Sequence, residues 1–339
     1  MGDLRATIES LGRRGGAVLR GLGAAALFLF AAWAELALLF KAPLGAAARP
    51  WLAALAAAVF LAAAAALLLR RFERLVLPVA LVMILVLLGW WSTLTPSVLG
   101  QWPAEVMRNT AVAIKGDDVE VRNVRTFRWN GPATADERWE DRIYTFSDLK
   151  SVDLFVSEPK NGGIPQSFVS FVFGAGPPLA LSLELRGDRG ESISALAGLF
   201  RKYTVAMIAA DETDAFRMRT SLRGERLFRY RLPLKTEAAA KLLTAYAARS
   251  QDLHNRPEFF NTLWNQGASV LALMRAAGLV STGTDYRALI PGRDAEVLYG
   301  LDLIEKAKSF DEARHRADIT DIARNAALDS SYSTVLRQK

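Results

Sequence analysis

The stretch WLAALAAAVFLAAAAALLL, residues 51–69, consists entirely of apolar side chains. Two similar stretches flank it: Gly21–Phe40 is apolar except for Glu35, and Leu75–Trp91 is apolar with one proline, Pro78. About 20 apolar residues in a helix cross the hydrocarbon core of a bilayer, so each stretch predicts a transmembrane helix. The first span is long and two more follow it, which favours an uncleaved anchor over a signal peptide.

The basic residues beside these spans predict how the chain crosses the membrane. Four arginines precede the first span and three lie in the turn at 70–74, whereas the loop between the first two spans holds only Lys41 and Arg49. The positive-inside rule therefore predicts a cytoplasmic N-terminus, and it predicts that the chain from residue 92 onward lies on the outer side.

The net charge of +7 does not indicate nucleic-acid binding. The first 91 residues hold nine of the 42 basic residues and only four of the 35 acidic residues, so the outer part is nearly neutral. The basic excess marks the cytoplasmic face of a membrane, where anionic lipids attract it.

The outer part shows patterns of both strands and helices. Val112–Trp129 alternates around the turn-prone residues Gly116–Asp118, which predicts a β-hairpin or a pair of short strands. Further strands are expected at 151–156, 167–173, 178–185, 204–209 and 227–232, and helices at 191–203, 236–249 and 268–277. This order indicates an α+β domain. The last residues, Ser330–Lys339, are polar and are candidates for disorder.

Several short motifs occur in a recognisable order between Trp90 and Thr320. They are Trp90-Trp91, Thr95-Pro96-Ser97, Trp102-Pro103, Val119–Arg125, Asp141-Arg142-Ile143-Tyr144, Ser151–Phe155, Ser182-Leu183-Glu184, Gly190–Ala195, Ala210-Asp211-Glu212, Arg256-Pro257-Glu258, Leu289–Gly292 and Leu298-Tyr299. In these motifs the chain resembles the Lnb-type N-terminal periplasmic domain family. That family is similar to lipoprotein N-acyltransferases and to permuted papain-like (NlpC-type) thiol enzymes.

The resemblance implies a permuted papain/NlpC-like periplasmic domain behind three transmembrane helices, in a multi-pass protein of the bacterial inner (cytoplasmic) membrane. Under this interpretation residues 1–20 are a cytoplasmic tail and 21–91 the membrane region. Residues 92–325 are the Lnb-like domain, and 326–339 are a polar C-terminal tail.

The resemblance also locates the site where thiol chemistry belongs. The family histidine precedes the strand 167–173, at the position of Gln166, and the family cysteine falls at Gly267. Glutamine takes up no proton near neutral pH and glycine offers no nucleophile. The whole chain contains no cysteine, so a pseudoenzyme is expected. Glu184 retains the family's acidic position, as an orienter or as a structural residue.

Other groups in the sequence are candidates to replace the missing pair. Ser269 and Ser170 are possible nucleophiles, but neither has a histidine near it in sequence. His254 and His315, the only histidines, are expected at the surface. Ser147-x-x-Lys150 matches the Ser-x-x-Lys pattern of penicillin-binding enzymes, but this pattern fixes only two positions. The Lys-Thr-Gly motif that accompanies it in those enzymes is missing, so the match carries little weight.

The sequence therefore predicts binding without a cofactor or metal. We expect an accessory or scaffolding subunit of a membrane complex, or a module that binds a lipoprotein or lipid. Its expected partners are membrane lipids, other integral membrane or periplasmic proteins and lipoproteins, with no nucleic acid. The alternative is an active lipoprotein acyltransferase or hydrolase with a non-thiol nucleophile. Glu35, inside the first span, either snorkels, packs within its own helices or meets another membrane subunit.

Overall fold

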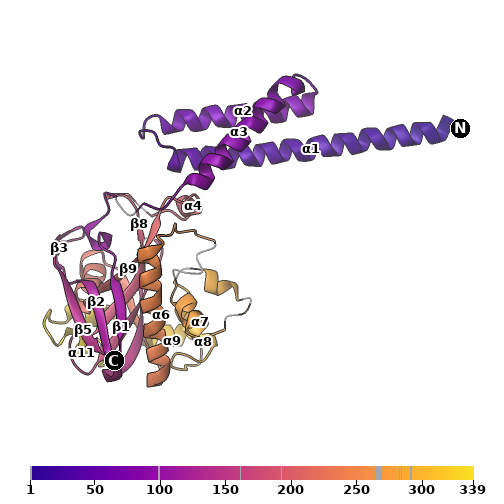
Figure 1. The fold of residues 1–339 in the computed structure, drawn as a ribbon. Coiled ribbons are helices and arrows are strands. Elements are labelled where there is room, and N and C mark those ends of the chain that lie inside the picture. Colours follow the sequence, from indigo (N-terminus) through magenta and orange to yellow (C-terminus); the bar gives the residue numbers. More distant parts are fainter. Residues whose placement is uncertain are drawn as a thin grey trace. The chain divides into compact units, whose positions relative to one another are not determined.

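The computed structural model describes residues 2–97, 100–160, 162–191, 193–263, 269–281, 283, 285–290 and 292–339, without the side chains of 2–14 and 289. The chain divides into two compact units (Figure 1). The first unit comprises Met1–Thr95 with Phe200–Lys202, and the second comprises Pro96–Leu199 with Tyr203–Lys339.

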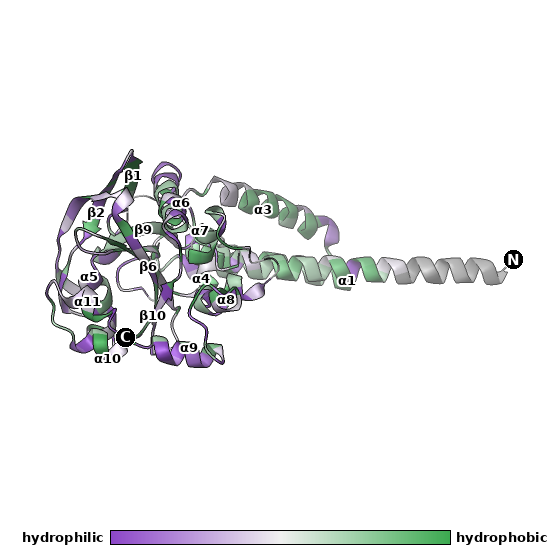
Figure 2. Cartoon of the chain, turned by 90° about the horizontal axis from the view of Figure 1, so that it is seen from below, coloured by the Kyte–Doolittle hydropathy of each residue, from purple (hydrophilic) through white to green (hydrophobic). Residues whose placement is uncertain are grey.

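The first unit consists of three long helices: α1 (Gly2–Lys41), α2 (Arg49–Leu69) and α3 (Glu73–Thr93). All three are long and apolar enough to cross a membrane, as the sequence predicts. α2 begins with a proline in its first turn and ends at Arg70, which adopts the left-handed conformation of a helix cap. Figure 2 shows α3 as hydrophobic along most of its length.

Small side chains fill the contacts between these helices. Ala34 and Ala63 are fully buried, and they belong to one apolar cluster with Phe60. Alanine lets helix backbones approach closely, which is how helices associate in a membrane where the lipid itself is apolar. Large side chains such as Leu29 point outward, where lipid would cover them.

The second unit is built on an eight-stranded sheet with the order β1-β2-β9-β8-β7-β6-β10, and β5 pairs with β2 outside this path. Its strands are β1 (Ala111–Lys115), β2 (Asp118–Arg125), β5 (Trp139–Thr145), β6 (Leu149–Glu158), β7 (Gln166–Phe173), β8 (Leu179–Arg186), β9 (Thr204–Ala210) and β10 (Arg226–Leu232). Among the strands of the described residues, β2 and β9 alone pair in parallel. A separate hairpin joins β3 (Arg128–Gly131) to β4 (Thr134–Asp136).

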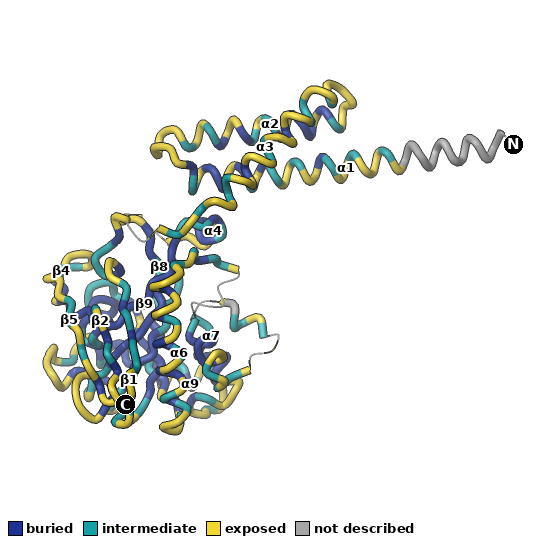
Figure 3. The backbone as a smooth tube through the Cα atoms, in the orientation of Figure 1, coloured by how far each residue is buried: buried dark blue, intermediate teal, exposed yellow. Residues whose placement is uncertain are grey.

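Helices cover both faces of this sheet. Side chains alternate along β7, so Phe171 meets Tyr246 of α6 (Thr236–Asn255) while Phe168 meets Phe216 of α5 (Glu212–Arg217). Since both faces are covered, β9 is buried at every residue, and Figure 3 shows the central strands in the colour of buried residues.

The remaining helical segments are short. They are α4 (Ala195–Leu199), α7 (Val270–Ala276), α8 (Asp294–Gly300), α9 (Phe310–Ala317), α10 (Thr320–Asn325), α11 (Tyr332–Val335), a π-helix (Met218–Leu222) and 3-10 turns at Ala104–Val106, Phe146–Asp148 and Tyr286–Leu289. The α+β class is thereby confirmed, and so is the hairpin of β1 and β2. The permuted papain-like arrangement stays a prediction.

Two local expectations were wrong. The helix expected over 191–203 is reduced to α4. The segment 330–339, a candidate for disorder, packs onto the sheet, because Tyr332 and Leu336 are buried in the same apolar cluster as Phe155. These two apolar residues lie four apart on one helical face, and the polar residues between them hid that pattern.

Candidate functional site

Gln166, at the position of the family histidine, is the first residue of β7. Its Nε2 donates a 2.9 Å hydrogen bond to the carbonyl of Leu183 on β8. The residue borders a cavity of about 80 Å³, which Ser269, at the start of α7, also borders. The structure therefore brings the strand of the missing base and the helix of the missing nucleophile to one cavity. Gly267 itself lies outside the described residues.

Asp294, at the start of α8, is the only acidic residue among the described residues that line this cavity. Its side chain is 6% exposed, and the Ser167 hydroxyl donates to its Oδ2 at 2.6 Å. Burial raises the pKa of Asp294, against the opposing effect of hydrogen bonds from Ser167 and the Leu271 backbone. No basic side chain pairs with Asp294 among the residues that the structure describes.

Tyr246 forms another part of the cavity wall, from α6. The residue is 1% exposed, and its ring meets Phe171 edge-on. Burial raises the pKa of its hydroxyl, with a further contribution from the nearby Asp294. No hydrogen bond joins this hydroxyl to another described residue, although the side chain lines the cavity.

The two possible serine nucleophiles lie in different surroundings. Ser269 is the N-cap of α7, where its Oγ accepts a 3.1 Å hydrogen bond from the Ala272 N–H. Ser170 is fully buried in β7 and donates to Glu212 at 2.6 Å, away from this cavity. No histidine borders the cavity within the described part of the chain. Neither hydroxyl therefore has an imidazole to activate it there.

Glu184 is held in a buried ionic cluster. It accepts a 2.9 Å hydrogen bond from Ser182 and lies 3.5 Å from Arg219 of the π-helix, which is equally close to Glu225. The Arg219 guanidinium also lies over the ring of Phe168, 4.7 Å from its centre. These contacts favour a structural role for Glu184, and its role as a retained family acid stays a prediction.

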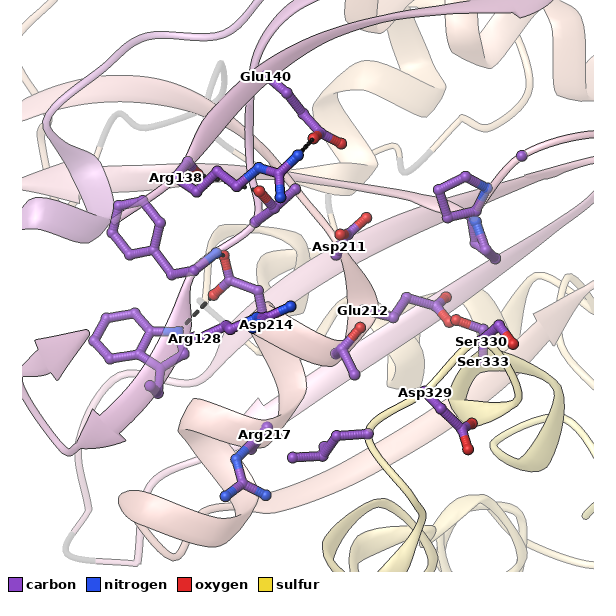
Figure 4. A pocket seen from close by; sticks show the side chains of 18 of the residues that line it. Arg128, Arg138, Glu140, Asp211, Glu212, Asp214, Arg217, Asp329, Ser330 and Ser333 are labelled. Carbon is purple, nitrogen blue, oxygen red and sulfur yellow. Dashed lines mark hydrogen bonds and ion pairs between the residues drawn. The ribbon is translucent and has the colours of Figure 1, made fainter. Parts of the chain in front are cut away.

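A second cavity, of about 1260 Å³, is much larger (Figure 4). It is lined by the β3–β4 hairpin, the start of β5, the end of β7, the loop at 176–178, α5 and the C-terminal segment. Seven acidic residues and four arginines line it: Asp136, Glu137, Glu140, Asp211, Glu212, Asp214, Asp329, Arg128, Arg138, Arg217 and Arg337.

A buried ion pair supports the wall of this large cavity. Arg125, which is fully buried, donates from Nε to Asp214 at 2.9 Å. Asp214 also accepts hydrogen bonds from the Phe127 backbone at 2.9 Å and from the Trp129 indole at 2.6 Å. Burial raises the pKa of Asp214, and the attraction of Arg125 opposes this shift. Asp214 lies in the first turns of α5, and its hydrogen bond from Trp129 joins that helix to β3. The cluster therefore fixes the start of α5 against β3.

The C-terminal segment reaches the same cavity through Arg337. Its guanidinium donates to both oxygens of Glu212, at 2.8 and 2.6 Å, and to Asp153 at 2.9 Å. Both carboxylates are almost fully buried. Desolvation lowers the pKa of Arg337, but the carboxylates outweigh it and the pKa is raised. This triad explains why the polar end of the chain is ordered.

The other residues singled out in the sequence lie away from both cavities. His254 and His315 are exposed, as expected. Ser147 donates to Asp117, and Lys150 pairs with Asp148, so the Ser-x-x-Lys pattern forms no site. Glu35 is exposed on α1, and its role stays a prediction. Within the described residues, no group of three or more potential metal ligands occurs.

Sequence reasoning missed Asp294 and Tyr246, the two buried polar residues of the small cavity. Tyr246 has the spacing of an ordinary core residue of α6, and Asp294 resembles a helix-starting aspartate after Pro291-Gly292. A faint signal was available, since an acidic residue in the first turn of a short apolar helix often faces other polar groups.

Three membrane-length helices in one unit and a mixed sheet flanked by helices in the other define a membrane protein with one α+β domain. Residues 135–292 match the family model of the Lnb N-terminal periplasmic domain, which confirms the resemblance. The match and the three apolar helices together support a membrane protein with a periplasmic domain. No curated protein and no solved structure matches the chain.

Proposed function

We propose that the periplasmic domain is a pseudoenzyme that binds rather than catalyses, in a protein of the inner membrane with a cytoplasmic N-terminus. The observation that carries this proposal is Gln166, whose amide is committed to the Leu183 carbonyl in the cavity where a base would act. An amide is not a base near neutral pH, and the chain offers no thiol to activate.

On this proposal the protein is an accessory or scaffolding subunit of a membrane complex, or a module that binds a lipoprotein or lipid. Exposed apolar residues of the three helices, such as Leu85, suit contact with lipid or with other integral membrane proteins. Glu35 supports a protein partner, because a carboxyl on an outward face of a membrane helix is stabilised by a polar group or by reaching the interface.

The test is acyl transfer by the purified full-length protein in detergent, with a lipoprotein as acceptor and phospholipid as donor. We expect no transferred acyl group and, by mass spectrometry of the intact chain, no acyl adduct. Transfer at a rate above that of a heat-denatured sample would overturn the proposal.

The alternative, an enzyme with a serine nucleophile, is supported by the position of Ser269 at the small cavity. A fluorophosphonate probe separates the two functions. The binding proposal expects no labelling of the native protein, and labelling lost specifically in Ser269→Ala would establish the enzyme instead. Ser170→Ala is the matched control, because Ser170 is fully buried outside this cavity.

The role of Glu35 is tested by extraction from native membranes in mild detergent, with the size of the complex as the measurement. If Glu35 meets another subunit, Glu35→Leu should release the protein in a smaller form while Glu35→Gln retains part of the association, because an amide still forms hydrogen bonds. Unchanged size in both variants would show that Glu35 only reaches the interface.

A further inference from the structure

The small cavity beside Gln166 holds a buried acid that no basic side chain neutralises within the described part of the chain. Asp294 is bonded by Ser167 and by the backbone of Leu271, but neither donor carries a positive charge. A carboxylate without a counter-charge is costly to bury, so it is protonated or it faces a bound cation. A bound cationic group would remove this cost.

Tyr246 supplies an independent observation. Its side chain is 1% exposed and borders the same cavity, and no hydrogen bond joins the hydroxyl to another described residue. Buried tyrosine hydroxyls usually find a partner, so a ligand or water in the cavity can supply one here. Asp294 is close enough to this hydroxyl to raise its pKa.

The remaining polar wall of the cavity also offers acceptors. The Gln166 Nε2 is occupied by the Leu183 carbonyl, which leaves the amide Oε1 as an acceptor. The cavity volume of about 80 Å³ has room for a few water molecules or one small head group. A group that fits must therefore be small, positively charged and able to donate several hydrogen bonds.

We propose that this cavity binds a primary ammonium group, carried by an ethanolamine-type lipid head or by a free small amine. The proposal rests on the binding function proposed above and names the ligand chemistry of the same site. An ammonium has three N–H donors and one charge, which match a carboxylate, a phenol oxygen and an amide oxygen. The lipid source is favoured because the chain carries its own membrane helices.

The experiment measures thermal unfolding of the full chain in detergent with ethylammonium chloride, against tetramethylammonium chloride at equal ionic strength. A quaternary ammonium has the charge but no N–H donors. We expect ethylammonium alone to raise Tm, with an apparent affinity about tenfold weaker in Asp294→Asn and about fivefold weaker in Tyr246→Phe. Thr334→Ala, in the large cavity, is the matched control and should bind as the wild type does.

Equal shifts with both cations, or no shift with either, would overturn the proposal. If Asp294→Asn does not fold, Tyr246→Phe still decides, because unchanged affinity in that variant contradicts the assignment. Nanodiscs of phosphatidylethanolamine should stabilise the chain more than those of phosphatidylcholine. Equal stabilisation, together with a shift by free ethylammonium, identifies a free amine as the source. Stabilisation by an amine-terminated peptide but not by ethylammonium would overturn the proposal.

The same samples distinguish this proposal from the proposed function. Intact-mass measurement after incubation with phospholipid reports any covalent acyl adduct. An adduct overturns the pseudoenzyme proposal whether or not amines bind, whereas absence of both adduct and ethylammonium binding overturns the ammonium site alone.

Discussion

Removing the Asp214 carboxylate should destabilise the periplasmic domain severely. In Asp214→Ala the guanidinium of Arg125 stays fully buried without its partner, and the N–H groups of Phe127 and Trp129 lose their acceptor. Breaking a buried ion pair costs about 3–5 kcal/mol. Each orphaned N–H adds about 1 kcal/mol, for a total of about 5–7 kcal/mol. For a domain of this size the loss corresponds to about 10–25 °C in Tm.

The assay is thermal unfolding of the full chain in detergent, followed by near-ultraviolet circular dichroism, which reports packing of aromatic side chains. The matched control is Asp321→Ala. The Asp321 carboxylate is exposed, and it pairs with Arg324 at a distance of 3.5 Å, which is longer than the pair of Arg125 with Asp214. Exposed pairs contribute about 0–1 kcal/mol, so the control should lower Tm by a few degrees at most. Equal effects of the two substitutions would refute the account of the buried pair.

A double variant sharpens this test. Arg125→Met combined with Asp214→Ala removes both charges, and apolar replacement of a buried pair is often nearly neutral. We therefore expect the double variant to be more stable than Asp214→Ala alone, although the Trp129 and Phe127 donors remain unsatisfied. A double variant less stable than both single variants would show that the charges are not coupled.

Three further predictions concern the missing thiol pair, the C-terminal segment and pH. The thiol introduced by Gly267→Cys should react with iodoacetamide at pH 6.5 several-fold more slowly than the same thiol in the double variant with Gln166→His, because a nearby imidazole lowers a thiol pKa. Equal rates in the two variants would contradict the assignment of these positions. Arg337→Ala should cost about 3 kcal/mol in thermal unfolding, since the buried Glu212 loses its cation while Asp153 keeps Arg229, whereas the exposed Arg316→Ala should change little. A hydrogen bond from Arg249 lowers the pKa of Glu258. The advantage of the wild type over Glu258→Gln should therefore be present at neutral pH and fade as pH falls through the lowered value; a constant difference from pH 7 to pH 3 would exclude it.

The sequence predicts the elements with a strong period better than those held by distant contacts. The three apolar spans and the strand 204–209 are long uniform patterns, and the structure confirms them. The helix expected over 191–203 is shortened, since its apolar residues share the segment with Gly198 and with the turn at Arg201, which has a positive φ. Local spacing alone does not show such interruptions.

The same contrast between local sequence patterns and distant contacts holds for the candidate site. The resemblance locates Gln166 and Gly267, and the structure brings Gln166 and Ser269, two residues beyond Gly267, to one cavity. It does not locate Asp294, which lies two residues beyond the matched segment and is held at the cavity by hydrogen bonds from Ser167 of β7 and the Leu271 backbone of α7. The order of the C-terminal residues also depends on a distant contact, because the carboxylate partners of Arg337 lie on β6 and α5. Partners that far apart in sequence have no local pattern.

The hydrogen bond from Gln166 to the Leu183 carbonyl has one more consequence. A backbone carbonyl accepts but never donates, so a histidine placed at position 166 that kept this bond would have to use a protonated ring nitrogen for it. Its other nitrogen would then be an acceptor in the neutral ring. The sheet backbone therefore selects a tautomer in advance, and a single substitution would recover an oriented base even though the chain now carries none.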